Sequence, residues 1–425
     1  MTERLHDQPG EGAGDPAATI LGLDDAGDLG PRKLALLAGA EVVAGPRRLL
    51  DALEKALPPL ARRIPIAGGL DGWLEEMPLA GQGRRLLVLA DGDTNFFGLG
   101  ARAREALAPR RADLIPAPTA VQKAFALLGD SWAGVETVSL HGRRDFGPFW
   151  SALFRAGQIT GPGRLAVYTD QENTPGAIAG RLLSRGQENW RLAVFQDLGL
   201  PGQTVWAGGL EEAARTSFSP LNLAVLERTA LPEALTLGAP ESAFDHAAGL
   251  ITKSEVRTAA LGLLELSGLE TMWDLGCGSG SVSLEAGLIL RHGQIHAVEK
   301  DPGRAAQARR NRSRFGAAHL EIIEGQALEV MPDLPRPDRV FVGGGGRQLE
   351  ALLRGVMGCL APGGLAVAAV VRLDSLDAAI SSLSASGQPA SVTQILAARG
   401  EPLAGSLLLK PINPVFLVKG RAPSG

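Results

Sequence analysis

Three glycines alternate with other residues in the run Met272–Ser281, which reads M-W-D-L-G-C-G-S-G-S. An apolar stretch leads into Asp274, and an amphipathic segment, Val282–Arg291, follows the glycines. A strand, a glycine-rich turn and a helix in this order let backbone groups approach a nucleotide-like ligand closely. The next apolar run ends on Glu299, twenty-five residues after Asp274, and an acid at the tip of the second strand suits the two hydroxyls of a ribose.

The spacing of Gly276, Gly278 and Gly280 indicates which cofactor this turn binds. The dinucleotide pattern G-x-G-x-x-G would need a glycine at position 281, where this chain has Ser281. The acid ahead of the first glycine repels a pyrophosphate, but it suits a cation such as the amino group of S-adenosylmethionine. We therefore predict an S-adenosylmethionine site, in preference to a nicotinamide site or to a turn without a ligand.

Length, composition and charge limit the class of protein. The 425 residues predict two or three domains, and 45% of them are hydrophobic, as in ordinary globular proteins. No apolar run approaches the ~20 residues of a membrane span, and a net charge of −4 argues against a nucleic-acid partner. The two cysteines, Cys277 and Cys359, form no disulfide framework, so we expect a cytoplasmic location. No residues have the spacing of metal ligands, so we expect no metal.

The chain divides into two halves that each alternate strand-like and helix-like segments, which predicts mostly parallel α/β sheets. We expect a disordered tail over residues 1–16, a first domain over 17–230, a linker over 231–246 and a second domain over 247–425. The strands predicted in the first half are Thr19–Leu23, Glu41–Val43, Arg85–Leu89, Asp113–Ile115, Thr137–Ser139 and Leu165–Tyr168. Those in the second half are Met272–Leu275, Gln294–Val298, Leu320–Ile323, Arg339–Val342 and Leu365–Val371, with a terminal antiparallel pair, Thr393–Ala397 and Val415–Val418.

Two further turns of the second half follow predicted strands. Gln326 comes after Leu320–Ile323, and its side chain can reach an adenine. Gly343 and Gly344 open a run of four glycines after Arg339–Val342, and glycine allows backbone and ligand to approach closely. Doubly wound sheets bind ligands at the C-terminal ends of their strands, so both turns are expected at the cofactor.

The second half carries the runs G-L-I-T-K-S-E-V-R, W-D-L-G-C-G-S-G-S-V-S, H-A-V-E-K-D, R-N-R-S-R-F-G and V-F-V-G-G-G-G. In these it resembles the decarboxylating precorrin methyltransferases of the CbiT type. The resemblance implies that S-adenosylmethionine contacts the glycine turn and Glu299. It also places Thr252 and Lys253, which match the family's Thr-Lys pair, near the cofactor or a substrate carboxylate. The alternative for this pair is a plain helix start, because Thr252 and Glu255 spell a capping box.

The first half carries L-A-D-G-D-T-N-F-F-G from residue 89 and I-P-A-P-T-A-V-Q-K-A from residue 115. These resemble two loops of the tetrapyrrole methyltransferases, whose two α/β lobes bind S-adenosylmethionine between them. The runs S-L-H-G-R from residue 139 and T-D-Q-E-N-T-P from residue 169 are similar to the CbiE type of that family. The resemblance implies cofactor contacts at Asp93, Thr119 and Ala120 and a substrate-facing role for His141 and Arg143. For His141 a structural role is the alternative.

Together the two halves resemble the fused methyltransferases that act on precorrin-6Y in cobalamin biosynthesis, over about residues 17–419. The resemblance implies an N-terminal two-lobed tetrapyrrole-methylase fold and a C-terminal Rossmann-like class I methyltransferase fold. It implies methylation of precorrin-6 (in its reduced form, precorrin-6B) at carbons 5 and 15, with decarboxylation of the acetate on carbon 12, giving precorrin-8.

The resemblance also suggests partners: a precorrin substrate, a homo-oligomer formed through either domain, and hand-over of product to neighbouring enzymes of the pathway. Three other functions remain open at this point. They are a non-catalytic S-adenosylmethionine sensor, another small-molecule methyltransferase, and an RNA methyltransferase, the last opposed by the net charge of −4.

Overall fold

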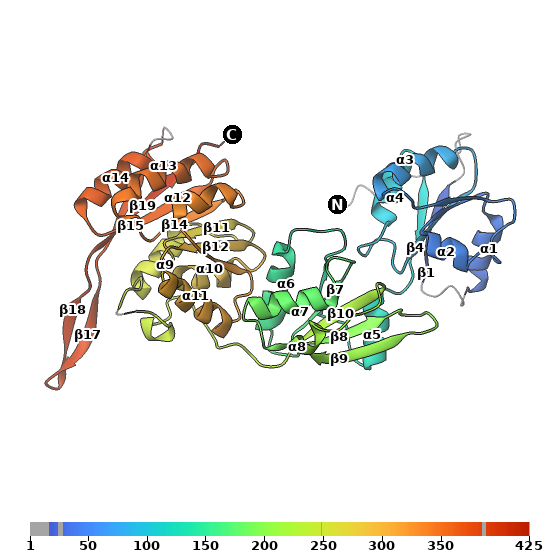
Figure 1. Cartoon of the computed structure of the whole chain (residues 1–425). Helices are drawn as coiled ribbons and strands as arrows, with labels where there is room; N and C mark the ends of the chain where they lie inside the picture. The colour runs from blue at the N-terminus through green and yellow to red at the C-terminus, as the bar shows by residue number, and fades with distance from the viewer. Residues whose placement is uncertain (1–16, 24–28, 248, 385–387, 425) are drawn as a thin grey trace. The chain divides into compact units, whose positions relative to one another are not determined.

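The computed structural model describes residues 17–23, 29–247, 249–384 and 388–424. They form two compact units (Figure 1). The first takes its residues from Met1–Ala133, Phe195–Val205 and Leu221–Leu223, and the second from Gly134–Val194, Trp206–Pro220 and Ala224–Gly425. The predicted tail over 1–16 lies outside the described residues.

The first unit is built on a parallel five-stranded sheet in the order β3-β2-β4-β1-β5. Adjacent residues of one strand face opposite sides of this sheet: Ile20 and Leu21 are both fully buried, in two different hydrophobic clusters. A sheet buried on both faces explains why its strands are continuous apolar runs. The strands are β1 (Ala18–Leu23), β2 (Val42–Gly45), β3 (Arg62–Pro65), β4 (Leu86–Asp91) and β5 (Ala112–Ile115). The helices are α1 (Pro31–Gly39), α2 (Arg47–Ala52), α3 (Leu70–Ala80), α4 (Gly100–Leu107) and α5 (Ala120–Leu128).

A second five-stranded sheet has the order β6-β7-β10-β8-β9. Its core gathers around the aromatic side chains of Phe149 and Trp150, which α6 contributes. The strands are β6 (Glu136–Ser139), β7 (Arg164–Tyr168), β8 (Trp190–Gln196), β9 (Thr204–Gly209) and β10 (Asn222–Arg228). The helices are α6 (Gly147–Gln158), α7 (Pro175–Ser184) and α8 (Leu210–Ala213).

The C-terminal domain, within the second unit, has a seven-stranded sheet in the order β13-β12-β11-β14-β15-β19-β16. The first five strands are parallel, and β19 is antiparallel to both β15 and β16. The strands are β11 (Thr271–Leu275), β12 (Gln294–Glu299), β13 (Leu320–Glu324), β14 (Arg339–Val342), β15 (Leu365–Val370), β16 (Ser391–Ile395) and β19 (Val415–Arg421). The helices are α9 (Ser254–Leu263), α10 (Ser281–Ile289), α11 (Pro302–Arg314), α12 (Ala327–Val330), α13 (Leu349–Cys359) and α14 (Leu373–Leu383), with 3-10 turns η1 (Glu241–Ala243), η2 (Met331–Asp333) and η3 (Gly346–Gln348).

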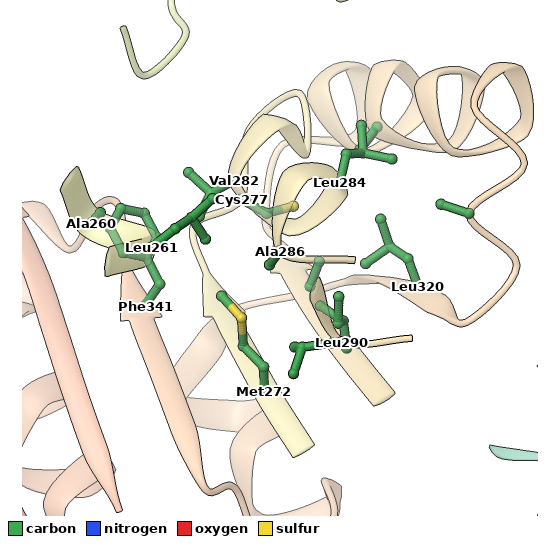
Figure 2. Packing of buried hydrophobic residues seen from close by; sticks show 14 of the residues in the cluster. Ala260, Leu261, Met272, Cys277, Val282, Leu284, Ala286, Leu290, Leu320 and Phe341 are labelled. Atoms are coloured by element: carbon green, nitrogen blue, oxygen red, sulfur yellow. The ribbon is translucent and has the colours of Figure 1, made fainter. Parts of the chain in front are cut away.

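The core of this domain has a layer on each side of the sheet. Met272 belongs to one layer and Trp273 to the other, as the two-residue repeat of a strand requires. Figure 2 shows the first layer, in which Leu261 of α9 and Val282 of α10 lie over Phe341 of β14. Each fully buried side chain of this size stabilises the fold by about 1.5–3 kcal/mol. The layers thus fix the strand ends from which the predicted site residues project.

Most predicted strands agree with the observed ones to within two residues, and the predicted α/β class and terminal antiparallel pair are confirmed. Two features were not predicted. Between β16 and β19 the chain forms a two-stranded ribbon, β17 (Ala398–Leu403) and β18 (Ser406–Pro411), which extends from the sheet (Figure 1). In the predicted linker, Ala239 and Phe244 are buried in the core of the C-terminal domain.

Candidate functional site

Backbone hydrogen bonds to the neighbouring strand hold the glycine turn after β11. The amides of Gly276 and Cys277 donate to the carbonyl oxygen of Val298 in β12, at 2.9 and 3.1 Å. Gly276, Gly278 and Gly280 have φ angles of 80°, 57° and 78°, a left-handed conformation that favours glycine. Helix α10 begins directly after Gly280, and this cap residue supplies no side-chain hydrogen bond.

A second glycine-rich turn, which follows β14, lies against the first. The amide of Gly343 donates to the carbonyl oxygen of Leu275 at 3.1 Å. A Cβ atom on Gly276 would lie 3.3 Å from the amide nitrogen of Gly344, tighter than most real contacts of a Cβ. The two predicted glycine sets therefore meet at the C-terminal ends of adjacent parallel strands, β11 and β14.

Asp274 is a buried carboxylate directly beneath this turn, with none of its surface exposed. Its Oδ2 accepts a short hydrogen bond from the hydroxyl of Ser283 in α10, and its Oδ1 has no partner among the described residues. Burial raises the pKa of Asp274 to about 7, and the nearby Glu299 carboxylate adds to the rise. An unpaired oxygen on a buried acid fits the cationic amino group of a ligand.

Glu299 ends β12 beside the turn and is 2% exposed. Its carboxylate accepts hydrogen bonds from the amides of Gly278 and Asp301, both at 2.9 Å. Arg304 lies 3.1 Å from the same carboxylate. Glu299 is thus held in place by the turn and by the start of α11, with lone pairs left for the hydroxyls of a ribose.

Gln326 follows β13, the strand next to β12, and its loop is tied to Glu299 because the amide of Gly325 donates to the Glu299 carbonyl oxygen at 3.0 Å. The Gln326 side chain is exposed and donates to Glu329 at 3.2 Å. Turning this amide toward an adenine therefore requires breaking one exposed hydrogen bond, which contributes only modestly to stability.

Thr252 and Lys253 lie at the start of α9. The alternative capping box does not form: the residue in the cap position is Lys253, without a side-chain hydrogen bond, and Glu255 pairs with Arg399 instead. The carbonyl oxygen of Thr252 accepts a 2.6 Å hydrogen bond from Arg257. Arg257 in turn forms a fully buried ion pair with Glu285 of α10, at 2.8 Å, which fastens this segment to the helix of the glycine turn.

Sequence reasoning missed four residues that support this site: Ser283, Arg257, Glu285 and Arg399. Ser283 and Glu285 stand in an apolar helix pattern, where a short serine or a lone acid gives no signal. The Arg257–Glu285 and Arg399–Glu255 pairs join residues that are 28 and 144 positions apart. Only the fold brings such partners together.

In the first unit, three strand ends converge on Gly22. A Cβ on this residue would lie 2.2 Å from the carbonyl oxygen of Gly92 and 2.8 Å from the amide nitrogen of Ala117, so only glycine fits there. The amide of Gly92 donates to Leu23 at 2.8 Å. Asp93 follows at the end of β4, and its Oδ1 accepts from the amide of Asn95 at 2.8 Å.

Thr119 and Ala120 begin α5 at this same edge of the sheet. Thr119 forms a capping box with Gln122: its hydroxyl accepts from the Gln122 amide at 3.1 Å, and its amide donates to the Gln122 side chain at 2.8 Å. The Thr119 side chain is therefore engaged by its own helix. Residues 24–28, which follow β1, lie outside the described part of the chain.

In the second unit, His141 and Arg143 form an exposed turn after β6. The runs that begin at residues 139 and 169, both predicted to belong to the site, are joined by hydrogen bonds. Asp170 accepts from the amide of Gly142 at 2.7 Å, and the Asn173 side chain donates to the carbonyl oxygen of Arg143 at 3.1 Å. Burial raises the pKa of Asp170, but its hydrogen bonds from the Asn173, Gly142 and Glu172 amides outweigh this, so the pKa is lowered. His141 Nδ1 lies 3.3 Å from the carbonyl oxygen of Thr169.

Among the described residues, no helix is both long and apolar enough to cross a bilayer. Within the same residues, no group of three or more His, Cys, Asp or Glu side chains could hold a metal ion.

Two solved structures resemble parts of the chain. A precorrin-6Y C5,15-methyltransferase from Geobacter metallireducens has a TM-score of 0.42 at 36% identity, covering 43% of this chain and 97% of that one. A cobalamin biosynthesis precorrin-6Y methylase from Archaeoglobus fulgidus has a TM-score of 0.39 at 20% identity, covering 50% of this chain and 98% of that one.

Family models and curated relatives cover both halves. The Precorrin methyltransferase domain matches residues 242–420, and the Tetrapyrrole (Corrin/Porphyrin) Methylases match residues 21–214. A probable cobalt-precorrin-6B C(15)-methyltransferase (decarboxylating) from Pyrobaculum aerophilum is 40% identical over 190 residues, 44% of this chain and 97% of that protein. The precorrin-6Y C(5,15)-methyltransferase (decarboxylating) of a Sinorhizobium species is 32% identical over 418 residues, 94% of this chain and 95% of that protein. The chain therefore belongs to the family of decarboxylating precorrin-6Y C(5,15)-methyltransferases.

Proposed function

We propose that this chain methylates carbons 5 and 15 of precorrin-6, in its reduced form precorrin-6B, and decarboxylates the acetate on carbon 12 to give precorrin-8. The observation that carries the proposal is the alignment of 94% of the chain with a relative named for both methylations and the decarboxylation. Two separate glycine-lined strand edges, at Gly22 and at Gly276, support two methyl-transfer sites in one chain.

The methyl donor of this family is S-adenosylmethionine, which supplies an electrophilic methyl group on a sulfonium centre when it is bound. In the C-terminal domain, the unpaired Oδ1 of Asp274 fits its amino group. We assign the ribose hydroxyls to Glu299 and the adenine to Gln326. The turns at Gly276, Gly278 and Gly280 and at Gly343 and Gly344 leave room for backbone contact.

Methyl transfer to an electron-rich ring carbon depends mainly on proximity and in-line orientation, so it needs no strong acid–base pair. Lys253, with Thr252 beside it, would hold a substrate carboxylate. In the decarboxylation, the bond between the acetate CH₂ and its carboxylate breaks, carbon dioxide leaves, and the electron pair enters the conjugated ring. The same carbon then takes up a proton and becomes a methyl group. We assign this step and the carbon-15 methylation to the C-terminal domain.

The carbon-5 methylation is assigned to the N-terminal half. Asp93 and the start of α5 at Thr119 and Ala120 would contact the cofactor there, although the hydroxyl and the amide of Thr119 both already bond to Gln122. His141 and Arg143, both exposed, would face the carboxylates of the substrate.

The assembly is proposed from the ribbon. One face of β17 and β18 carries no charge, because the register places Gly400 opposite Leu409 and Pro402 opposite Leu407, and these leucines are 70% and 69% exposed. A two-stranded ribbon is marginally stable by itself, which supports a homo-oligomer formed through this face. Size-exclusion chromatography of Leu407→Ser/Leu409→Ser against the wild type tests it. Hand-over of product to neighbouring enzymes and a cytoplasmic location remain predictions.

The decisive experiment incubates the purified chain with S-adenosylmethionine and metal-free reduced precorrin-6 and then measures the product mass. We expect a product with two more methyl groups and one carbon dioxide less. Binding of S-adenosylmethionine without any change in precorrin mass would instead indicate the sensor function.

A further inference from the structure

Arg399 joins three segments of the C-terminal domain that are remote in sequence. It lies on β17, and its guanidinium forms paired hydrogen bonds with two carboxylates. Nη1 and Nη2 bind Glu241 at 2.7 and 2.9 Å, and Nε and Nη2 bind Glu255 at 2.8 and 2.6 Å. Nη2 also donates to the hydroxyl of Ser254 at 3.1 Å. All three guanidinium nitrogens are therefore used, a geometry that lysine cannot reproduce.

The bound carboxylates control the start of α9. Lys253 is the cap residue but supplies no side-chain hydrogen bond, and Glu241 replaces it by accepting from the amide of Ser254 at 2.9 Å. Arg399 holds Glu241 and, through Glu255, the first turn of the helix. The N-terminus of α9 is thus capped by a residue of another segment, Glu241 of η1, which Arg399 of β17 holds in place. Its position depends on the ion-pair cluster that Arg399 forms with Glu241 and Glu255.

Arg399 carries the positive charge that both carboxylates of this cluster bind. Hydrogen bonds from Arg399 hold the pKa values of Glu241 and Glu255 at about 2, although burial opposes the shift. Both acids are therefore ionised at neutral pH. Without the guanidinium, two carboxylates next to the same helix turn would repel each other, and the segment ahead of Ser254 would lose its anchor.

A second anchor acts on the other side of the same segment. Buried Arg257 holds the carbonyl oxygen of Thr252 at 2.6 Å, and it is fixed by Glu285. The two anchors fasten the backbone on either side of Lys253. Over the described residues, the side chains of Thr252 and Lys253 themselves make no hydrogen bond or ion pair, so they remain available to a ligand.

We propose that Arg399 is a positioning residue for the C-terminal methyl-transfer site, which orients Thr252 and Lys253 toward the substrate. The inference rests on the proposed function of that site. Arg399 acts through Ser254, Glu241 and Glu255, not by touching substrate. Because it belongs to β17, the ribbon and the site are mechanically linked, so a shift of the ribbon moves the segment that carries Lys253.

The test compares Arg399→Gln with Arg354→Gln in the intact chain. Arg354 forms an exposed pair with Glu350 one helical turn away in α13, so its variant removes one arginine and one ion pair from the same domain without touching α9. For Arg399→Gln, the kcat of carbon-15 methylation should fall roughly 10- to 100-fold, as expected for a misplaced contact. Carbon-5 methylation by the same molecules serves as the internal standard and should be unchanged.

Two further measurements distinguish a positioning role of Arg399 from a general loss of stability. The KM for S-adenosylmethionine should stay constant, because Asp274 and Glu299 lie on β11 and β12. Hydrogen exchange of the amides at 254–257 should become faster, while that of β11 stays slow. Arg399→Lys keeps the charge but cannot bridge both acids, so it should restore little of the rate.

The proposal is overturned if Arg399→Gln matches Arg354→Gln in carbon-15 rate, or if both methylations fall equally. If Arg399→Gln does not fold, Glu255→Gln decides in the same way, because it weakens the cluster while Glu241 stays paired. A wild-type rate and exchange pattern in that variant would also refute the proposal. A wild type that methylates nothing would disprove the proposed function instead, and the exchange measurement would still test the role of Arg399.

Discussion

Replacing Asp274 by asparagine should stabilise the cofactor-free protein at neutral and alkaline pH. The carboxyl is fully buried, and burial raises its pKa from 3.8 to about 7. A folded-state pKa above the unfolded value means that the unfolded chain releases this proton first. The ionised group therefore destabilises the fold progressively as the pH rises from about 4 to about 7.

The magnitude follows from the same shift. The rise from 3.8 to about 7 corresponds to about 4 kcal/mol at pH values above 7. Asparagine has the same shape, carries no charge, and can still accept the hydroxyl of Ser283. Urea unfolding of Asp274→Asn and of the wild type, both without cofactor, should show a difference that approaches this value at pH 8 and vanishes below pH 4.

Cofactor binding should show the opposite preference. A cationic amino group next to Oδ1 favours the ionised carboxylate, so binding at pH 6 should release a proton from Asp274. Calorimetry at pH 6 in buffers of different ionisation enthalpy measures that proton. Asp274→Asn should release none and should bind more weakly, and Asp274→Ala should abolish carbon-15 methylation while sparing carbon-5 methylation.

Two results would refute this reasoning. One is a stability difference between Asp274→Asn and the wild type that does not change with pH, because burial would then not raise the pKa of the Asp274 carboxyl. The other is the loss of both methylations in a folded Asp274→Ala protein, which would mean that the two sites are coupled.

Three more predictions follow from the structure. Gly276→Ala should cost about 1–2 kcal/mol, because φ is 80° there, and should weaken binding of S-adenosylmethionine; an unchanged urea midpoint would contradict this. Arg257→Met should cost about 3–5 kcal/mol by leaving Glu285 buried and unpaired, whereas Arg257→Met/Glu285→Leu should cost less; equal midpoints for the single and double variants would argue against a pairing effect. Cleavage of the chain between Leu231 and Leu237 should release two folded halves, and the C-terminal half should methylate carbon 15, since a Pyrobaculum relative matches this domain over 97% of its length. Halves that are active only when recombined would contradict this prediction.

The sequence alone was sufficient for the features that depend on short segments. The D-x-G-x-G-x-G run predicts a strand, a turn and a helix, because three left-handed residues in one turn need glycine. Apolar runs predict parallel strands buried on both faces, and Glu299 and Gly343 follow such strands. Since the C-terminal ends of parallel strands share one edge of a sheet, the chain order already predicts which of these residues meet.

Tertiary structure decided what depends on residues that are distant in the chain. The capping box spelled by Thr252 and Glu255 does not form: α9 begins one residue later, with Lys253 in the cap position, and Glu255 binds Arg399, 144 positions away. The sequence predicts that Asp274 binds the cofactor, but it does not predict the raised pKa of this residue. That shift follows from the complete burial of Asp274 beneath α10. The sequence places Phe244 in a predicted linker, whereas in the structure it is buried in the core of the C-terminal domain. A single aromatic residue has no periodicity from which its burial could be predicted. Pairing and burial are sums over many neighbours, and a local pattern contains only a few of them.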